Sequence, residues 1–319
     1  MSKLFSLILN ELGKIFVLKS TWAMYIILAG IIIVSAVITS TSNFIDTDKT
    51  YSDDWKTELQ EENESLMTEI EEAEDDPFIE SSNMGIIEEN EYYIENDVRP
   101  YGYHAGDFTM DNLFLTSLIS LFTIIVGGGI VANEFRWGTI KQLLIRPISR
   151  GVILLSKYIA LLLFTLITVL FLIVVSVAVG AVFYGLPAVN PEIVVTRPDG
   201  MATSALIWET LMMYGFRTLN IIILATFAFM ISSIFRSSAL AIGLAMFLMF
   251  AGTTAAQALA RYEWSKYILF ANTDLSIYYN FSGPIRDEMT IWFSTGVIVV
   301  YMIVFIIAAW TVFTKRDVA

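Results

Sequence analysis

The chain has 319 residues, of which 56% are hydrophobic and 16% charged, a composition far from that of a soluble domain. It contains no cysteine and one histidine, which excludes a disulfide framework, a thiolate metal site and most histidine-based catalysis. The formal net charge is −13, but 22 of the 32 acidic residues lie within residues 42–112, beside three basic ones. The acidic balance therefore describes one segment, and the rest of the chain is net positive.

The chain begins with an amphipathic segment, residues 3–19. Its polar side chains share one wedge of a helical wheel: Lys3, Ser6, Asn10, Gly13 and Lys14. This pattern predicts an N-terminal interfacial helix (residues 1–20) that lies in the membrane plane with its lysines toward the headgroups. An amphipathic helix packed on a protein core is the alternative, and the membrane span that follows at once favours the interfacial interpretation.

Six apolar runs are long enough to cross about 30 Å of hydrocarbon. They cover residues 21–41, 113–131, 151–184, 211–234, 239–259 and 291–313. The third run is over-long, so it either tilts or projects beyond the bilayer. The predicted fold class is an all-α polytopic membrane protein with six transmembrane helices. Six spans place most loops rich in Lys and Arg on one side, so the positive-inside rule predicts that both termini are cytoplasmic.

Residues 42–112, between the first two runs, form an acidic insert that this topology places outside the cell. Leu59, Leu66 and Ala73 recur at sevenfold spacing, and a weaker helical period follows Pro77. The pattern predicts a helical hairpin with a thin apolar seam, and disorder is the competing interpretation because of the high net charge. A dense negative patch can attract cations, but most charge runs are solvated faces.

The segment at residues 260–290 is too polar to span a membrane and too aromatic for an ordinary loop. We expect short helices that dip into the outer leaflet, because Trp and Tyr favour the headgroup zone.

A basic, amphipathic loop, residues 133–150, joins the second and third runs. Trp137, Ile140 and Leu144 fall at i, i+3 and i+7 and form a narrow apolar stripe on a helix. Pro147 ends that helix, and Ser149 is placed to N-cap the next one. Glu134 adds nothing to membrane orientation, so it either caps a helix start or couples to a partner.

Residues of this loop form the pattern E-x3-G-T-x3-L-L-x2-P-x-S-R-x6-K, which runs from Glu134 to Lys157. The pattern resembles the cytoplasmic signature of ABC-2 type transporter permeases, the membrane subunits of bacterial ABC exporters. The resemblance implies a coupling helix at residues 134–146 that docks on a separate ATPase. It assigns this coupling to Glu134, Trp137, Gly138, Thr139, Ile140, Leu144, Pro147 and Arg150.

The resemblance also implies partners and a location. Two copies of an ABC ATPase would bind ATP and Mg, and a second permease, identical or paralogous, would complete the pathway in a bacterial plasma membrane. The chain itself has no G-x4-G-K-[ST] loop, and its Gly127-Gly128-Gly129 run fits close helix packing better than phosphate binding. We expect no cofactor, metal, catalytic residue or nucleic-acid partner in this chain.

Two charged residues in the fourth run are candidates for lining a pathway. Glu209 and Arg217 are eight residues apart on one helical face, and charges at membrane depth usually face a cavity or a partner. The alternative is that both are interfacial, beside Trp208 and Tyr214. His104 is interpreted as structural.

Function classes other than a permease remain open. A membrane-anchored sensor or accessory protein would work through a ligand of the acidic insert, although six spans exceed what an anchor needs. An intramembrane enzyme is disfavoured because the usual nucleophile and metal motifs are missing from the sequence. A secondary transporter would usually show inverted repeats.

Overall fold

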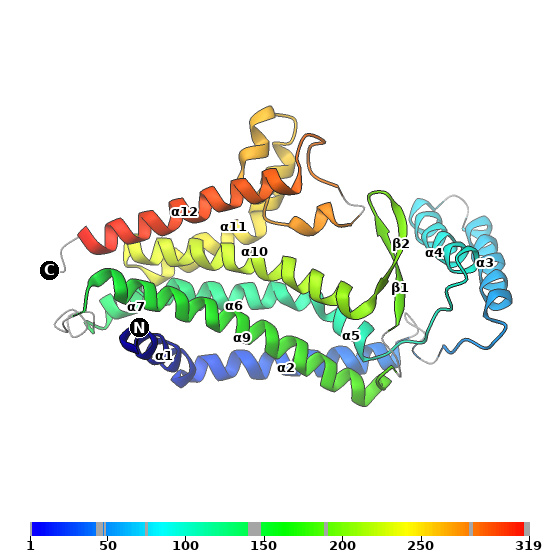
Figure 1. Ribbon diagram of the computed structural model, residues 1–319, viewed down its shortest axis with the longest axis horizontal. Coiled ribbons are helices and arrows are strands. Elements are labelled where there is room, and N and C mark those ends of the chain that lie inside the picture. The colour runs from blue at the N-terminus through cyan, green and yellow to red at the C-terminus, as the bar shows by residue number, and fades with distance from the viewer. Residues whose placement is uncertain are drawn as a thin grey trace.

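Six long apolar helices form a bundle along one axis of the molecule (Figure 1). The computed structural model describes residues 2–42, 47, 49–73, 76–139, 148–187, 191–280 and 283–315. The helices long and apolar enough to cross a membrane are α2 (Lys19–Thr41), α5–α6 (Ala105–Gly129), α9 (Arg150–Tyr184), α10 (Leu206–Phe235), α11 (Ser238–Ala258) and α12 (Ile291–Lys315). Each predicted run overlaps one of them, so the prediction of six helices long and apolar enough to cross a membrane is confirmed.

The second span begins at Ala105, earlier than predicted. It consists of α5 (Ala105–Asp111), the 3-10 turn η1 (Asn112–Leu115) and α6 (Thr116–Gly129). The acidic side chains in its first turns made this part of the span look too polar in the sequence. In the structure, these carboxylates accept hydrogen bonds from nearby residues. Tyr101 donates to Asp107 at 2.5 Å, and the backbone N–H of His104, the N-cap residue, donates to the same carboxylate at 2.9 Å. His104 therefore begins a helix.

Two helices, α6 and α10, occupy the middle of the bundle. In the α5–α6 span and in α10, 61% of the most apolar window is buried, against 17–28% in α2, α11 and α12. The packing is close at the glycine run of α6. A Cβ on Gly127 would lie 3.1 Å from the carbonyl oxygen of Ala225, and one on Gly128 would lie 2.7 Å from Ile242. These glycines allow α6 to approach α10 and α11, as predicted.

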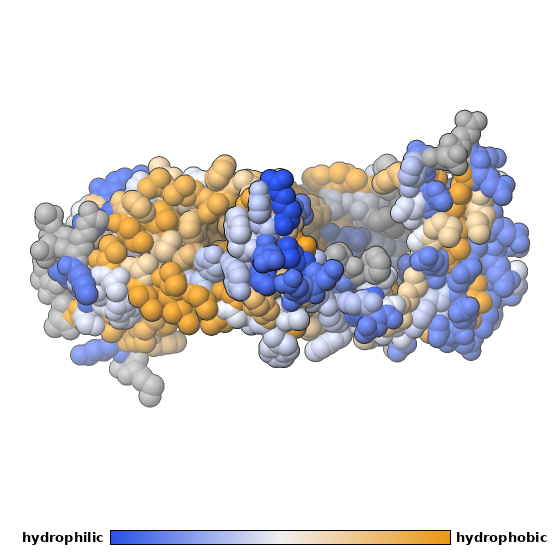
Figure 2. All heavy atoms as spheres, turned by 90° about the horizontal axis from the view of Figure 1, so that it is seen from above, coloured by the Kyte–Doolittle hydropathy of each residue, from blue (hydrophilic) through white to orange (hydrophobic). Residues whose placement is uncertain are grey.

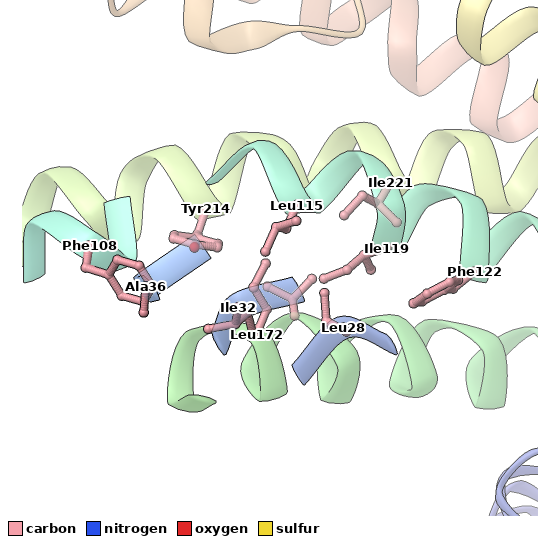
Figure 3. Packing of buried hydrophobic residues seen from close by; sticks show 11 residues of the cluster. Leu28, Ile32, Ala36, Phe108, Leu115, Ile119, Phe122, Leu172, Tyr214 and Ile221 are labelled. Carbon is pink, nitrogen blue, oxygen red and sulfur yellow. The ribbon is translucent and has the colours of Figure 1, made fainter. Parts of the chain in front are cut away.

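The largest apolar cluster joins four of the spans (Figure 3). Its buried side chains come from α2, α5–α6, α9 and α10: Leu28, Ile32, Ala36, Phe108, Leu115, Ile119, Phe122, Val169, Leu172, Tyr214 and Ile221. Tyr214 is therefore a core residue, not the interfacial residue expected from the sequence. Its hydroxyl donates to the carbonyl of Thr109 at 2.8 Å, which ties α10 to α5.

The acidic insert contains two antiparallel helices, α3 (Trp55–Glu72) and α4 (Pro77–Glu95), that pack together. The seam between them is apolar at one end, where Trp55, Leu59 and Tyr93 are buried. Farther along, amide–carboxylate hydrogen bonds replace apolar contacts: Asn90 donates to Glu62 and Asn83 donates to Glu69, each at 3.2 Å. Figure 2 shows hydrophilic surface over this end and apolar surface along much of the bundle, interrupted by a second hydrophilic patch near the middle of the view.

A β-hairpin corrects the all-α prediction. Strands β1 (Glu192–Arg197) and β2 (Gly200–Ala205) pair antiparallel, with Arg197 opposite Gly200 across the turn. Gly200 has a φ of +118°, which few residues with a side chain adopt. The hairpin stands between the bundle and the α3–α4 pair (Figure 1) and packs on the latter through Val194, which contacts the cluster around Trp55.

Three short 3-10 helices connect α11 to α12. Residues 263–278 form three 3-10 helices: η2 (Glu263–Tyr267), η3 (Leu269–Ala271) and η4 (Leu275–Tyr278). The first helix, α1 (Ser2–Val17), and the end of α12 lie at one end, which we call the terminal end; β1, β2, α3 and α4 lie at the other, the hairpin end (Figure 1).

Candidate functional site

A cluster of four charged residues joins three helices at the terminal end, and we call it the four-charge cluster. Lys157 of α9 donates to Glu11 of α1 at 2.6 Å and to Glu134 of α7 (Ala132–Arg136) at 2.7 Å. Lys14 of α1 donates to the same two carboxylates at 2.6 and 3.1 Å. The cluster is formally neutral and links positions up to 146 residues apart in the chain.

Burial makes this cluster energetically demanding. The side chain of Lys157 is fully buried, and those of Glu11 and Glu134 are 3% and 9% exposed. An ion moved out of water without a partner costs several kcal/mol, so each charge here depends on the others. Burial raises the pKa of Glu11, but the attraction of Lys157 and hydrogen bonds from Lys14 and Lys157 outweigh it and leave the pKa below its ordinary value. Burial lowers the pKa of Lys14, and the two carboxylates more than reverse that effect.

Helix α1 is shaped to deliver Glu11 to this cluster. Leu7, Ile8, Glu11 and Ile15 lie on one buried face, and Ile15 packs with Ala160 and Phe164 of α9. The chain then turns into α2, where Thr21 donates to the carbonyl of Ile15 at 2.6 Å and caps the end of α1. The buried face of α1, which packs on α9, fits the alternative considered from the sequence, an amphipathic helix packed on a protein core. The polar wedge and several apolar side chains, including Val17, remain exposed, as an interfacial helix requires.

The short helix α7 is tied to the rest of the bundle. Besides the ion pairs of Glu134, the Ala132 N–H donates to Ser232 of α10 at 3.1 Å. Phe135 packs edge-on against Phe313 of α12, and Arg236, which follows α10, lies 4.2 Å above the Phe135 ring. Arg150 at the start of α9 donates to the carbonyl of Thr314 on α12 at 3.4 Å. A displacement of α7 would therefore act on α1, α9, α10 and α12.

The residues that follow α7 include an exposed tryptophan and border the same cavity as Glu11, Lys14 and Glu134. Trp137 is 57% exposed and has Arg136 stacked 5.6 Å from its ring. Gly138 has a φ of +71°, which ends the helix, and Thr139 donates back to the carbonyl of Glu134 at 3.4 Å. Ile140, Leu144 and Pro147, which complete the predicted coupling set, lie outside the described residues. Ser149 N-caps α9 as predicted, accepting from Val152.

A cavity of about 830 Å³ adjoins the cluster. Its polar wall includes Glu11, Lys14, Asn133 and Glu134, and its apolar walls come from the start of α2 and the end of α6. The Oε2 atom of Glu134 is buried and has no hydrogen-bond partner among the described residues. Within that same part of the chain, no group of three or more His, Asp or Glu side chains could hold a metal ion.

The two predicted pathway residues lie toward the hairpin end, apart from the four-charge cluster. Glu209 is buried and accepts two hydrogen bonds from Arg197 of β1, at 2.7 and 3.2 Å, while that guanidinium lies 3.6 Å above the Tyr279 ring. Arg217 instead pairs with Asp274 at 3.0 Å, and both side chains are more than one third exposed. The structure does not bring Glu209 and Arg217 together.

Sequence reasoning missed Glu11 and gave Lys157 no role beyond the loop pattern. A signal was present, because Glu11 is an acidic residue on the apolar side of a helix whose other charges share a polar wedge. An isolated charge at such a position predicts a buried partner.

Comparisons with known proteins place the chain in a family. Residues 83–319 match the family described as "Protein of unknown function (DUF2705)". The chain is 39% identical to "Uncharacterized protein YhcI" of Bacillus subtilis (strain 168), over 98% of this chain and 99% of the relative. It is 31% identical to "Uncharacterized membrane protein YdbK" of the same organism, over 64% of this chain and 79% of the relative.

These matches correct the resemblance drawn from the loop. No ABC-2 permease family matches the chain, so that family assignment is wrong. The residues that carried it have structural roles in this fold: Gly138 ends α7, Ser149 caps α9, and Glu134 and Lys157 pair α7 with α9. The chain is a multi-pass membrane protein, and it belongs to the DUF2705 family.

Proposed function

We propose that this protein is the membrane-embedded subunit of an ATP-driven exporter whose ATPase is a separate soluble chain. One observation carries the proposal: α7 is anchored inside the bundle by the Glu134–Lys157 ion pair, while Trp137, three residues later, is exposed. An element fixed on one side and exposed on the other suits the transmission of a partner's movement.

The contacts of α7 describe how such a movement would spread. A partner that pulls Trp137 also pulls Glu134, whose carboxylate holds α1 through Lys14 and α9 through Lys157. Because a buried ion pair is costly to break, the helices follow α7 more readily than they separate from it. The hydrogen bond of Ala132 to Ser232 and the contact of Phe135 with Phe313 extend the coupling to α10 and α12.

Charge supports the proposed orientation. The terminal end carries exposed basic side chains, including Lys3, Lys19 and Arg136. The positive-inside rule assigns such an end to the cytoplasm, where ATP and a soluble ATPase are found. The chain contains no phosphate-binding loop, so in this proposal ATP and Mg are bound by the partner. Two ATPase copies and a second membrane subunit, identical or paralogous, would complete the assembly.

Affinity purification of the detergent-solubilised protein from its native cells tests the proposal. We expect a soluble ATPase to co-purify with the wild type and to be lost in Trp137→Glu, because a charge in an apolar contact weakens it. The control is Trp264→Glu, whose tryptophan is equally exposed (54%) but lies in η2, away from α7. Retention of the ATPase by Trp137→Glu, or its loss from both variants, would contradict the assigned docking surface.

The folded α3–α4 hairpin supports a second candidate, a membrane-anchored sensor whose acidic outer domain binds a ligand. Its apolar end is buried around Trp55 and held on β1, so the segment has a fixed surface. Deletion of residues 50–98 distinguishes the two candidates. The exporter proposal expects the shortened protein to insert and to retain its ATPase, because α7 is untouched. The sensor candidate expects the full-length protein to co-purify with a signalling partner in place of an ATPase.

A further inference from the structure

The second membrane-crossing helix changes its backbone geometry close to the hairpin end of the bundle. Its first seven residues form α5, the next four form the 3-10 turn η1, and α6 follows. At the end of η1 the Thr116 N–H donates to the carbonyl of Leu113, three residues earlier. A 3-10 turn inside a longer helix has poorer backbone hydrogen bonds than the α-helix around it and often marks a hinge. The span therefore bends more easily at η1 than elsewhere.

The two sides of η1 are held differently. The glycine run of α6 packs closely against α10 and α11, where a side chain would not fit. In α5, the Ala105 N–H donates to the carbonyl of Gly185, just beyond α9, at 3.1 Å. The carbonyl of Thr109 accepts from Tyr214 of α10 at 2.8 Å. Residues 96–104 connect α5 to α4, so a displacement of the acidic insert pulls on α5 before it reaches α6.

Two buried polar side chains near η1 lack hydrogen bonds. Asn112 of η1 and Ser176 of α9 are both 0% exposed, and neither the amide of Asn112 nor the hydroxyl of Ser176 has a partner among the described residues. The equally buried Asn272 shows how the fold satisfies such a group elsewhere. It donates to two backbone carbonyls at 2.8 Å and accepts from Ser294 at 2.6 Å. A buried amide without partners is costly, and water would supply the missing bonds.

Asn112 and Ser176 lie in one layer of the bundle. Gly180 of α9 packs closely on the first turns of α5, and Leu172 of α9 joins the apolar cluster that η1 also enters (Figure 3). Ser176 lies one turn of α9 from each of these residues, and Asn112 lies between the corresponding parts of the second span. A movement of α5 away from α9 would therefore open the layer that holds both residues.

We propose that α5 is a gate at the hairpin end of the bundle, which turns at η1 away from α9. In the open conformation water enters from the hairpin end and satisfies the Asn112 amide and the Ser176 hydroxyl. The structure described here is the closed conformation, in which these groups are dry. Because each unsatisfied group favours the hydrated state, the two residues set how often the gate opens, and the acidic insert is the element that pulls on it.

Labelling of a single introduced thiol tests the gate. The chain has no cysteine, so Ser176→Cys is the one thiol present, and its reaction with a water-soluble maleimide in detergent measures opening. We expect Asn112→Leu to slow this reaction about tenfold, because the open state loses the hydrated amide that favours it. The control thiol is Ser156→Cys, also buried on α9, where Ser156 donates to the carbonyl of Ile153 at 2.8 Å. Its rate should be the same with Asn112 or Leu at that position.

Three labelling results would overturn the proposal. They are an unchanged rate at Ser176→Cys in the Asn112→Leu background, no reaction at Ser176→Cys while Asn112 is present, and an equal change at Ser156→Cys. No ATP or partner is added, so the outcome is independent of the proposed exporter function.

Thermal unfolding in detergent tests the closed state separately. Leucine is close to asparagine in size, so Asn112→Leu removes the unsatisfied amide without leaving a large cavity, and we expect the unfolding midpoint to rise by about 2–4 °C. Asn272→Leu should lower the midpoint, because it removes a side chain that makes three hydrogen bonds. A lower midpoint in Asn112→Leu would show that the amide is already satisfied in the closed bundle and would overturn the gate.

Discussion

The ion pairs at the two ends of the bundle differ in how deeply they are buried and in which elements they join. At the terminal end, four charges from α1, α7 and α9 share hydrogen bonds, and the central lysine is fully buried. At the hairpin end, Glu209 pairs with Arg197 only 12 residues away, and Arg217 pairs with Asp274 at a partly exposed position. The first arrangement joins separate helices to one another. The second holds surface segments, the β-hairpin and η4, onto a single helix, α10.

Breaking the cluster should have the largest effect. Lys157→Met leaves Glu11 and Glu134 buried without their main partner, and we expect a loss of about 3–5 kcal/mol in stability. Thermal unfolding in detergent measures it. Addition of Glu134→Gln to Lys157→Met should recover part of the loss. The control, Lys56→Met, removes a lysine whose partner Asp97 is largely exposed and should change little. Equal losses in both single variants would contradict the comparison.

Glu209→Gln should have an intermediate effect. It replaces a buried carboxylate that accepts from both terminal nitrogens of Arg197, and we expect a loss of about 1–3 kcal/mol. The hairpin should also become more sensitive to protease, because its anchor on α10 is weakened. Glu192→Gln, on the exposed start of β1, is the matched control. A loss as large as that in Lys157→Met would show that the two ends are energetically alike.

Arg217→Leu should alter stability least. Both members of the Arg217–Asp274 pair reach solvent, so we expect a change within about 1 kcal/mol. Under the exporter proposal, transport should fall more than assembly if Arg217 lines the pathway. Measurement of both in the same membranes separates these effects, and unchanged transport would leave Arg217 a purely interfacial residue.

The pH dependence of α1 docking should appear only outside the neutral range. The folded-state pKa of Glu11 is lowered. Its contribution to the stability of the folded state is therefore complete at a pH above its ordinary pKa and is lost as the pH falls through the folded pKa. The pKa of Lys14 is raised, so its contribution is complete below its ordinary value and is lost as the pH rises through the folded pKa. Hydrogen exchange of α1 amides should therefore accelerate at both extremes. Acceleration near neutral pH would contradict this assignment.

The sequence predicted the spans well because a long apolar run has few alternatives to a membrane helix. It predicted helix ends where a local cap decides them, as at Ser149. It failed where pairing is distant: the partners of Lys157 are 146 and 23 residues away, and no local pattern links them. The β-hairpin was missed although Val194, Val195 and the turn before Gly200 are typical hairpin signals.

The loop pattern led to the wrong family for a physical reason. A glycine after a short helix, a serine before a span and basic residues between them are what a membrane-surface loop requires. Residues chosen by local structure recur in unrelated families, so they carry little information about ancestry. Glu134 was the informative residue of the pattern, and its partners became visible only in three dimensions.

Helix α9 runs the length of the bundle without a break (Figure 1). It has 35 residues, a length of about 52 Å at 1.5 Å per residue, well beyond the hydrocarbon thickness. Lys157 holds one end to α1 and α7, and at the other the Tyr184 hydroxyl donates to the carbonyl of Ala36 at 2.7 Å while Gly185 accepts from the N–H of Ala105. A rod of this length amplifies small rotations: a tilt of about 5° at the terminal end displaces the far end by about 4–5 Å. Because both ends of α9 are bonded to other spans, a tilt of this helix at the terminal end would have to move α2 and α5 at the hairpin end.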